Sequence, residues 1–204
     1  MSENEDDLPE HWPRLGQRLF VPGSPGRDAD VASGLDERMY WMKEAFKEAA
    51  DLLAIQAEES HHEQKKFVWP IVFCYRQYIE LALKEVITKH GEQVEPEIEP
   101  NWKSHKLGKL WAHCKSIMQE TLFGTTVDDI PGVRALEGLI NEFQGVDMGS
   151  YSFRYPTDTK GKLVEFPFES IDLANLKRVM EGIYTFLDCN KEVLALRFDG
   201  PYSM

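Results

Sequence analysis

The stretch 64–89 most constrains how this chain can fold, because apolar side chains occur on nearly every side of the helix that it predicts. A helix that is apolar all round is buried at the centre of a protein. Yet Arg76, Glu80 and Lys84 recur at every fourth residue and therefore share one stripe of this helix. Burying an unpaired charge costs several kcal/mol, so the stripe needs either ionic partners or water. The sequence therefore predicts a central helix with one polar stripe.

Two interpretations of this stripe remain open from the sequence. In the first, the three charges form a ladder of salt bridges on the one strip of the helix that faces solvent, where each pair stabilises by about 0.3–0.5 kcal/mol. In the second, they form the polar floor of a cleft with aromatic walls, since Trp69 and Phe73 project into the same sector.

Apolar residues at three- and four-residue spacing predict four further helices, at about 30–62, 104–121, 129–145 and 170–196. Gly91 is expected just past the end of the central helix, and Asp128 or Asp129 is expected to cap the fourth helix. Residues 150–168 alternate aromatic side chains around a proline and a Thr-Lys-Gly turn, which favours a short β-hairpin or an ordered loop.

We therefore expect an all-α protein, an antiparallel bundle of about five helices with a short β-hairpin-like insertion. Residues 30–204 are expected to form this single domain. Residues 1–29 are acidic and rich in proline and glycine, a composition that breaks regular structure and predicts an extended arm.

The formal net charge of −12 disfavours a broad surface for binding nucleic acid. The charge is uneven, however: residues 1–63 carry 15 acids and 6 bases, whereas residues 64–127 carry 9 bases and 7 acids. Lys103, Lys106 and Lys109 form one basic face close to His105 and Trp111. Such a face is usually only solvated, but it could hold a phosphate by charge and a base by stacking.

No apolar run approaches the roughly 20 residues that span a bilayer, and the acidic N-terminus does not resemble a secretory signal. The three cysteines, Cys74, Cys114 and Cys189, are far apart and odd in number, which indicates reduced thiols. We therefore expect a cytoplasmic protein with no membrane segment.

No cofactor and no metal site are expected. The pairs Glu58-x-x-His61 and Glu59-x-x-His62 resemble helical metal ligands, but a di-iron bundle needs a second copy of the motif on another helix. The sequence also lacks the glycine-rich phosphate loops GxGxxG and GxxxxGK[ST] and the nucleophile elbow GxSxG.

Residues 75–84 (YRQYIELALK) resemble the ELxLK-type core helix of HEPN proteins (higher eukaryote and prokaryote nucleotide-binding). Residues 104–111 (SHKLGKLW) are similar to the H-x-L-x-x-L start of the next helix in that family. The stretch 153–156 (FRYP), followed by Asp158 and Gly161, is similar to a signature of uncharacterised bacterial HEPN-like proteins. The resemblance covers roughly residues 64–161.

This resemblance implies an antiparallel helical bundle, often a homodimer, with a nucleotide or RNA as ligand. Many members are metal-independent ribonucleases of toxin or defence systems and use an Arg-x4–6-His motif. This sequence departs from that pattern, because the first histidine after Arg76 is His90, 14 residues further on. The resemblance therefore implies a binding fold without that ribonuclease motif.

Together these observations predict a polar cleft that binds a phosphate-bearing ligand. In it, His105 is the available acid or base at neutral pH, and Glu80 orients the neighbouring groups. The residues predicted to hold the ligand are Arg76, Lys84, Arg154, Trp111 and Lys109.

Two other functions are compatible with the same residues. In one, the chain is a non-catalytic homodimeric interaction or scaffold protein, and its central charges form a structural network. In the other, the acidic arm, residues 1–29, neutralises a basic protein partner.

Overall fold

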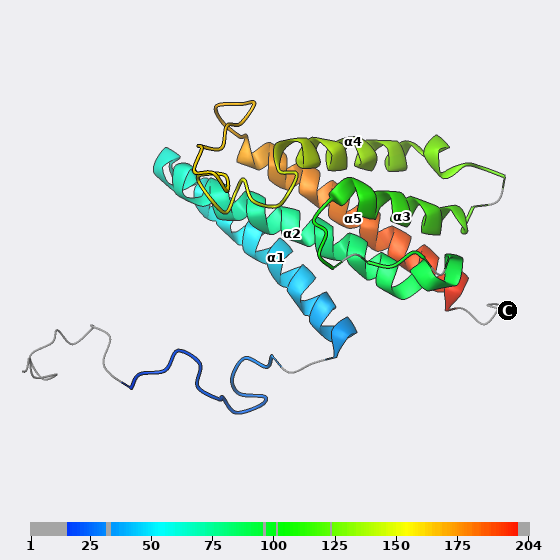
Figure 1. Ribbon diagram of the computed structural model, residues 1–204, viewed down its shortest axis with the longest axis horizontal. Helices are drawn as coiled ribbons and strands as arrows, with labels where there is room; N and C mark the ends of the chain where they lie inside the picture. The colour runs from blue at the N-terminus through cyan, green and yellow to red at the C-terminus, as the bar shows by residue number, and fades with distance from the viewer. Residues whose placement is uncertain (1–15, 32–33, 96, 101, 123, 200–204) are drawn as a thin grey trace, which may run out of the picture. The chain divides into compact units, whose positions relative to one another are not determined.

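The computed structural model describes residues 16–31, 34–95, 97–100, 102–122 and 124–199. These residues form five α-helices and a short 3-10 helix, and they contain no strand (Figure 1). The all-α class expected from the sequence is confirmed. The elements are α1 (Leu35–Ala57), α2 (His61–Val94), α3 (Leu107–Gln119), η2 (Val127–Asp129), α4 (Pro131–Val146) and α5 (Leu173–Phe198).

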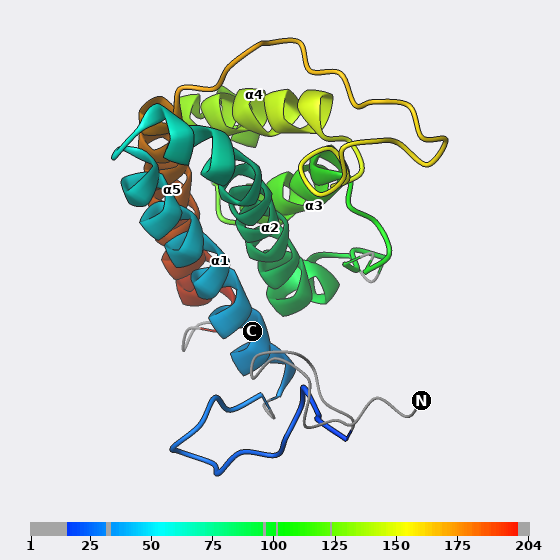
Figure 2. The same cartoon turned by 90° about the vertical axis from the view of Figure 1, so that its left-hand side faces the viewer.

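The helix α2 lies at the centre of the unit formed by residues 35–204. It packs against α1, α3 and α5, and Figure 2 shows it between α1 and α5 on one side and α3 on the other. The helix α4 packs on α3. Ile71, Tyr75, Ile79 and Leu83 are completely buried in the core. The apolar surroundings on several sides explain why the sequence of α2 is apolar nearly all round.

Several helix ends differ from the predicted ones. The helix α1 ends at Ala57, because Ser60 starts a new helix by accepting a hydrogen bond on its side chain from the Glu63 amide, at 3.2 Å. The cap of α4 is Ile130, without a side-chain hydrogen bond, so the prediction of an aspartate cap is wrong. Asp129 belongs to η2 instead.

Gly91 lies inside α2 and not beyond its end, where the sequence placed it. A Cβ atom at this position would stand 2.3 Å from the carbonyl oxygen of Ile98, so only glycine allows the following loop to return so closely. The helix continues to Val94, and the Glu95 amide donates to the Gly91 carbonyl at 3.0 Å.

The predicted hairpin at residues 150–168 is an ordered loop rather than a pair of strands. Thr157 and Leu163 form a single antiparallel bridge, and the Asp158 amide donates to the Lys162 carbonyl at 2.8 Å. Trp69 of α2 holds this insertion through ring contacts with two of its aromatic side chains. With only one bridge, the backbone has too few paired groups to make a strand.

Residues 1–34 form a separate unit. Its described part, residues 16–31 and 34, contains no helix or strand, and its clearest feature is a turn in which the Ser24 amide donates to the Asp28 carboxylate at 2.7 Å. The first half of the predicted arm, residues 1–15, lies outside the described residues.

In the described part of the chain, no helix has both the length and the apolar composition that crossing a membrane requires. In that same part, no group of three or more histidine, cysteine or acidic side chains is arranged to hold a metal ion.

The close approach at Gly91 makes a testable prediction about stability. We expect Gly91→Ala to lower the free energy of unfolding by roughly 1–3 kcal/mol, because the new methyl group would overlap backbone atoms of the returning loop. Gly138→Ala is the matched control: Gly138 lies in α4 with nothing near its missing Cβ, so this change should stabilise by about 0.5–1 kcal/mol. Urea denaturation of both variants measures the two effects, and equal effects would contradict the prediction.

Candidate functional site around His105

Arg76 is the most buried charge of the site, with none of its surface exposed. Its Nη1 donates to Glu80 Oε2 at 2.8 Å, its Nη2 donates to the backbone carbonyl of His105, and its Nε donates to the carbonyl of Asp147 at 3.4 Å. A guanidinium stays charged at any pH at which proteins fold, so its burial requires such partners. One side chain of α2 thereby holds the segment before α3 and the segment after α4.

Glu80 is the acceptor at the centre of this network. Besides Arg76, it accepts a hydrogen bond from Lys84 Nζ at 2.7 Å, and its Oε1 lies 2.9 Å from Nδ1 of His105. Burial alone would raise the pKa of Glu80, but the hydrogen bond and charge of Lys84, together with His105 and Arg76, outweigh burial and lower the pKa below its usual value. Glu80 is therefore ionised at neutral pH and can only accept hydrogen bonds.

His105 is oriented by this carboxylate. Because ionised Glu80 has no proton to give, Nδ1 of His105 must be the donor, and in the neutral ring Nε2 then carries the lone pair. The His105 side chain is 41% exposed, and no residue in the described ranges hydrogen-bonds its Nε2. A buried carboxylate thus fixes the tautomer of an accessible histidine, an arrangement that suits proton transfer or binding of a polar ligand.

Lys84 is as buried as its partner, and its ammonium lies 5.6 Å from the centre of the exposed Trp102 ring. The interpretation of Arg76, Glu80 and Lys84 as a ladder on a solvent-facing strip is therefore wrong, since no side chain of the three is more than 4% exposed. In this arrangement Arg76 and Lys84 contact Glu80 rather than the surface, so they hold the carboxylate that orients His105.

A shallow hollow of about 380 Å³ opens beside His105. Lys103, Lys106 and His105 line it together with Tyr151, and no acidic residue belongs to its lining. The remaining lining residues are Ser104, Met148 and Gly149. The hollow therefore combines positive charge, an exposed aromatic ring and an oriented imidazole.

Arg154 is exposed next to this hollow. Its guanidinium lies 5.1 Å from the ring centre of Tyr151 and 5.7 Å from those of Phe73 and Tyr155, and its Nε donates to the Ser150 carbonyl. Tyr151 thus lines the hollow and is also one of the three aromatic rings that contact the Arg154 guanidinium. The sequence placed Arg154 with the other site residues, and in the structure Tyr151 connects it to them.

Two predicted ligand-binding residues lie elsewhere. Trp111 is 2% exposed and belongs to the hydrophobic core, so its ring cannot stack on a ligand from this position. Lys109 is exposed on α3 but does not line the hollow. The structure therefore brings together Arg76, Glu80, Lys84 and His105, with Arg154 beside them, and leaves these two residues apart.

Two residues that complete the site, Asp147 and Ser150, could not be recognised from the sequence pattern. Asp147 accepts hydrogen bonds on Oδ1 from the amides of Tyr151 and Ser152, at 2.8 and 3.1 Å, and its Oδ2 lies 3.6 Å from Arg76 Nε. Ser150 has a positive φ of 60°, and its hydroxyl accepts from Gln77 at 2.9 Å. No spacing in the sequence connects these residues with α2.

A second buried carboxylate on α2 shows what distinguishes this site. Glu85 forms salt bridges with Lys43 and Lys89, each at 2.7 Å. Burial alone would raise the pKa of Glu85, but the hydrogen bonds from these two lysines outweigh burial and lower the pKa to about 2. The hollow beside Glu85 has a volume of only about 20 Å³ and contains no histidine. Of these two carboxylates, Glu80 is therefore the one that links the buried charges of α2 to an accessible histidine.

No family model, curated protein or solved structure matches this chain. The function of the site therefore has to follow from its own residues.

The burial of Arg76 predicts a large loss of stability on its removal. Arg76→Ala removes the guanidinium that pairs with Glu80 and Asp147 and that donates hydrogen bonds to two backbone carbonyls. We therefore expect the free energy of unfolding to fall by about 3–5 kcal/mol. Arg178→Ala is the control, because Arg178 is exposed on α5 and its loss should cost at most about 0.5 kcal/mol. Denaturant unfolding measures both, and similar values for the two variants would contradict a structural role for Arg76.

The lowered pKa of Glu80 predicts a pH dependence with a definite sign. The ionised carboxylate stabilises the folded state above its ordinary pKa, and this contribution is lost as the pH falls through the lower folded pKa. The stability difference between the wild type and Glu80→Gln should therefore shrink between about pH 6 and about pH 3. A difference that stays constant over this range in urea titrations would show that folding does not lower the pKa of Glu80.

Proposed function

We propose that this chain is a HEPN-like protein that binds a phosphate-bearing ligand, a nucleotide or an RNA end, in the hollow beside His105. The observation that supports this most strongly is the pair of Glu80 and His105, in which a buried carboxylate lies 2.9 Å from an exposed imidazole. Apart from His105, the only charged residues that line the hollow are lysines. The two stretches that resemble the family, residues 75–84 and 104–111, supply both members of this pair.

Each group in the hollow has a role in this proposal. Lys103 and Lys106 attract the phosphate, and Arg154 adds a third positive charge next to Tyr151. The exposed ring of Tyr151 offers a stacking surface to a base. His105 Nε2 accepts a hydrogen bond from a ligand hydroxyl, or donates one to the phosphate when the ring is protonated.

Binding rather than cleavage is the core of the proposal, because the Arg-x4–6-His motif is missing. Where a bound RNA presents a 2′-hydroxyl beside an internal phosphate, His105 would take the hydroxyl proton as the oxygen bonds to phosphorus. The bond from phosphorus to the 5′-oxygen of the next nucleotide would break, and that oxygen would leave with a proton from water. The overall charge of −12 favours a short ligand or a strand end over a long polyanion.

The family resemblance extends the proposal to a cytoplasmic homodimer in a toxin- or defence-type system. The acidic arm, residues 1–29, would contact a basic protein partner in such a system.

A second function is favoured by the complete burial of Arg76. In a non-catalytic, homodimeric scaffold protein, the network of Arg76, Glu80 and Lys84 would serve only to fix the helices and loops, and His105 would only close its exposed end. This alternative predicts no ligand in the hollow, so a binding experiment separates the two.

The binding experiment uses a short single-stranded RNA with a 5′-phosphate and the same RNA without it, titrated into the full chain by calorimetry. We expect His105→Ala to weaken binding about tenfold, a loss of roughly 1.4 kcal/mol. The double variant Lys103→Ala/Lys106→Ala should weaken binding and also flatten its salt dependence, because fewer phosphate contacts release fewer counterions.

His113→Ala is the matched control, since His113 lies on α3 outside the hollow and its replacement should leave binding unchanged. If the wild-type chain binds neither RNA, or if His105→Ala binds as tightly as wild type, the hollow is not the site. The absence of binding together with a dimeric mass in solution would favour the scaffold function.

A further inference from the structure

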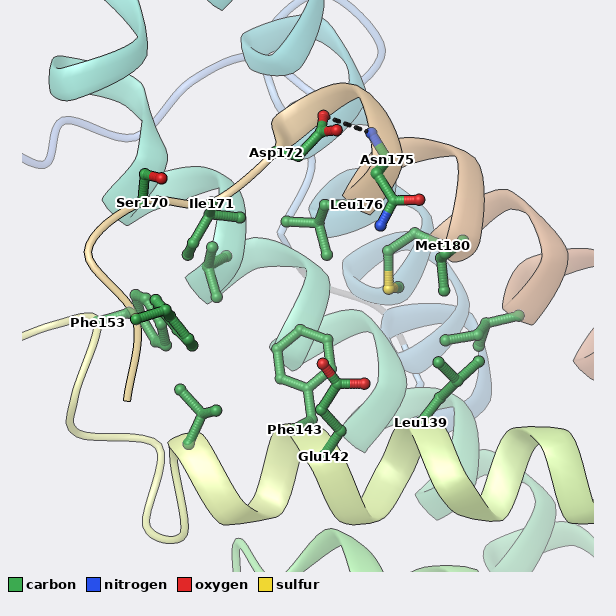
Figure 3. A pocket seen from close by; sticks show the side chains of 15 residues that line it. Leu139, Glu142, Phe143, Phe153, Ser170, Ile171, Asp172, Asn175, Leu176 and Met180 are labelled. Carbon is green, nitrogen blue, oxygen red and sulfur yellow. Dashed lines mark hydrogen bonds between the residues drawn. The ribbon is translucent and has the colours of Figure 1, made fainter. Parts of the chain in front are cut away.

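A second cavity, of about 330 Å³, lies between α4 and α5 and shares no lining residue with the hollow beside His105. Val72 of α2 forms part of its floor, and the two flanking helices contribute mostly aliphatic and aromatic side chains, among them Phe143, Leu176 and Met180 (Figure 3). Cavities of this size with mostly apolar walls are typical of small-molecule sites.

The cavity lies beyond a point where a side chain of α5 comes close to α4. At Gly132, near the start of α4, a Cβ atom would lie 2.7 Å from the ring of Phe186. The lining of the cavity begins about two turns further along α4, at Leu139, and extends to Val146 at the end of that helix.

The insertion closes the open end of this space. Phe153 and Phe168 both line the cavity, and Phe166 contacts each of them, with ring centres 4.9 and 5.8 Å apart. Phe166 also contacts Trp69 of α2 at 5.9 Å. This wall is therefore a connected cluster of rings attached to the central helix.

The charged groups that line the cavity are both acidic. Glu142 on α4 and Asp172 at the start of α5 belong to its lining, which contains no lysine or arginine. Asp172 accepts a hydrogen bond from the Asn175 amide at 2.9 Å, whereas Glu142 is exposed and has no ion-pair partner in the described part of the chain. In Figure 3 the Glu142 carboxylate projects from α4 into the space between the helices.

We propose that this cavity binds a small apolar amine, with its hydrocarbon body between α4 and α5 and its ammonium group paired with Glu142. The apolar walls supply the binding energy by removing hydrocarbon surface from water, and the carboxylate selects the charge. Arg178 donates to Oδ1 of the lining residue Asn175 at 2.6 Å, but Arg178 itself does not line the cavity. An anionic ligand of the same shape would bring its charge next to Glu142 and Asp172.

Three probes of matched shape test the proposal: 4-phenylbutylamine, 4-phenylbutan-1-ol and 4-phenylbutanoate. They are titrated into the full-length chain with 13C-labelled methionine methyl groups and followed by NMR. Met180 lines this cavity, Met148 lines the hollow beside His105, and Met118 is buried in the core away from both lining sets. We expect a saturable shift at Met180 alone, with the amine binding about fivefold more tightly than the alcohol and the carboxylate binding most weakly.

Glu142→Gln should remove the preference for the amine over the alcohol while leaving the shift at Met180. Glu192→Gln is the matched control, because it removes the same charge from an exposed position of α5 outside the cavity, and it should keep the preference. The proposal is overturned if no probe gives a saturable shift at Met180, if the carboxylate binds as tightly as the amine, or if the preference survives in Glu142→Gln. None of these outcomes affects the RNA titration, because the hollow beside His105 and this cavity share no lining residue.

Discussion

The buried guanidinium of Arg76 is the interaction on which the rest of this structure depends. A group that never loses its charge lies on the central helix with no exposed surface. Burying this charge without partners would cost a large part of the free energy that stabilises a domain of this size. Its partners come from three places: Glu80 one turn along α2, the carbonyl of His105, and Asp147. The segments before α3 and after α4 are therefore fixed by electrostatics as well as by apolar packing.

This requirement also explains why the accessible group of the site is a histidine on a loop. Arg76 and Lys84 carry two positive charges that Glu80 and Asp147 balance, so the buried part of the network is already neutral. His105 adds the one member of this network that reaches solvent. A ligand can therefore contact His105 without displacing the paired charges beneath it.

Much of the fold and part of the site could be predicted from local spacing. The i, i+4 relation placed Arg76, Glu80 and Lys84 together, and apolar periodicity gave the all-α class. The same periodicity puts Trp111 on the apolar side of α3, which argues for its burial rather than for a ligand contact. Periodicity extends only a few residues along the chain, whereas Asp147 is 71 residues from Arg76. Features that depend on how helices meet, such as the glycine contact at Gly91 and the space between α4 and α5, leave no such local pattern.

The insertion after α4 lines both the hollow beside His105 and the cavity between α4 and α5. Tyr151 lines the hollow beside His105, and Phe153, two residues further along the same short segment, lines the cavity between α4 and α5. The backbone that joins them is held by Asp147, whose Oδ1 accepts from the amides of Tyr151 and Ser152. A displacement of this segment changes the shape of both cavities at once. Any ligand that binds one of them with such a displacement is thermodynamically coupled to the other, with the same coupling free energy in either direction.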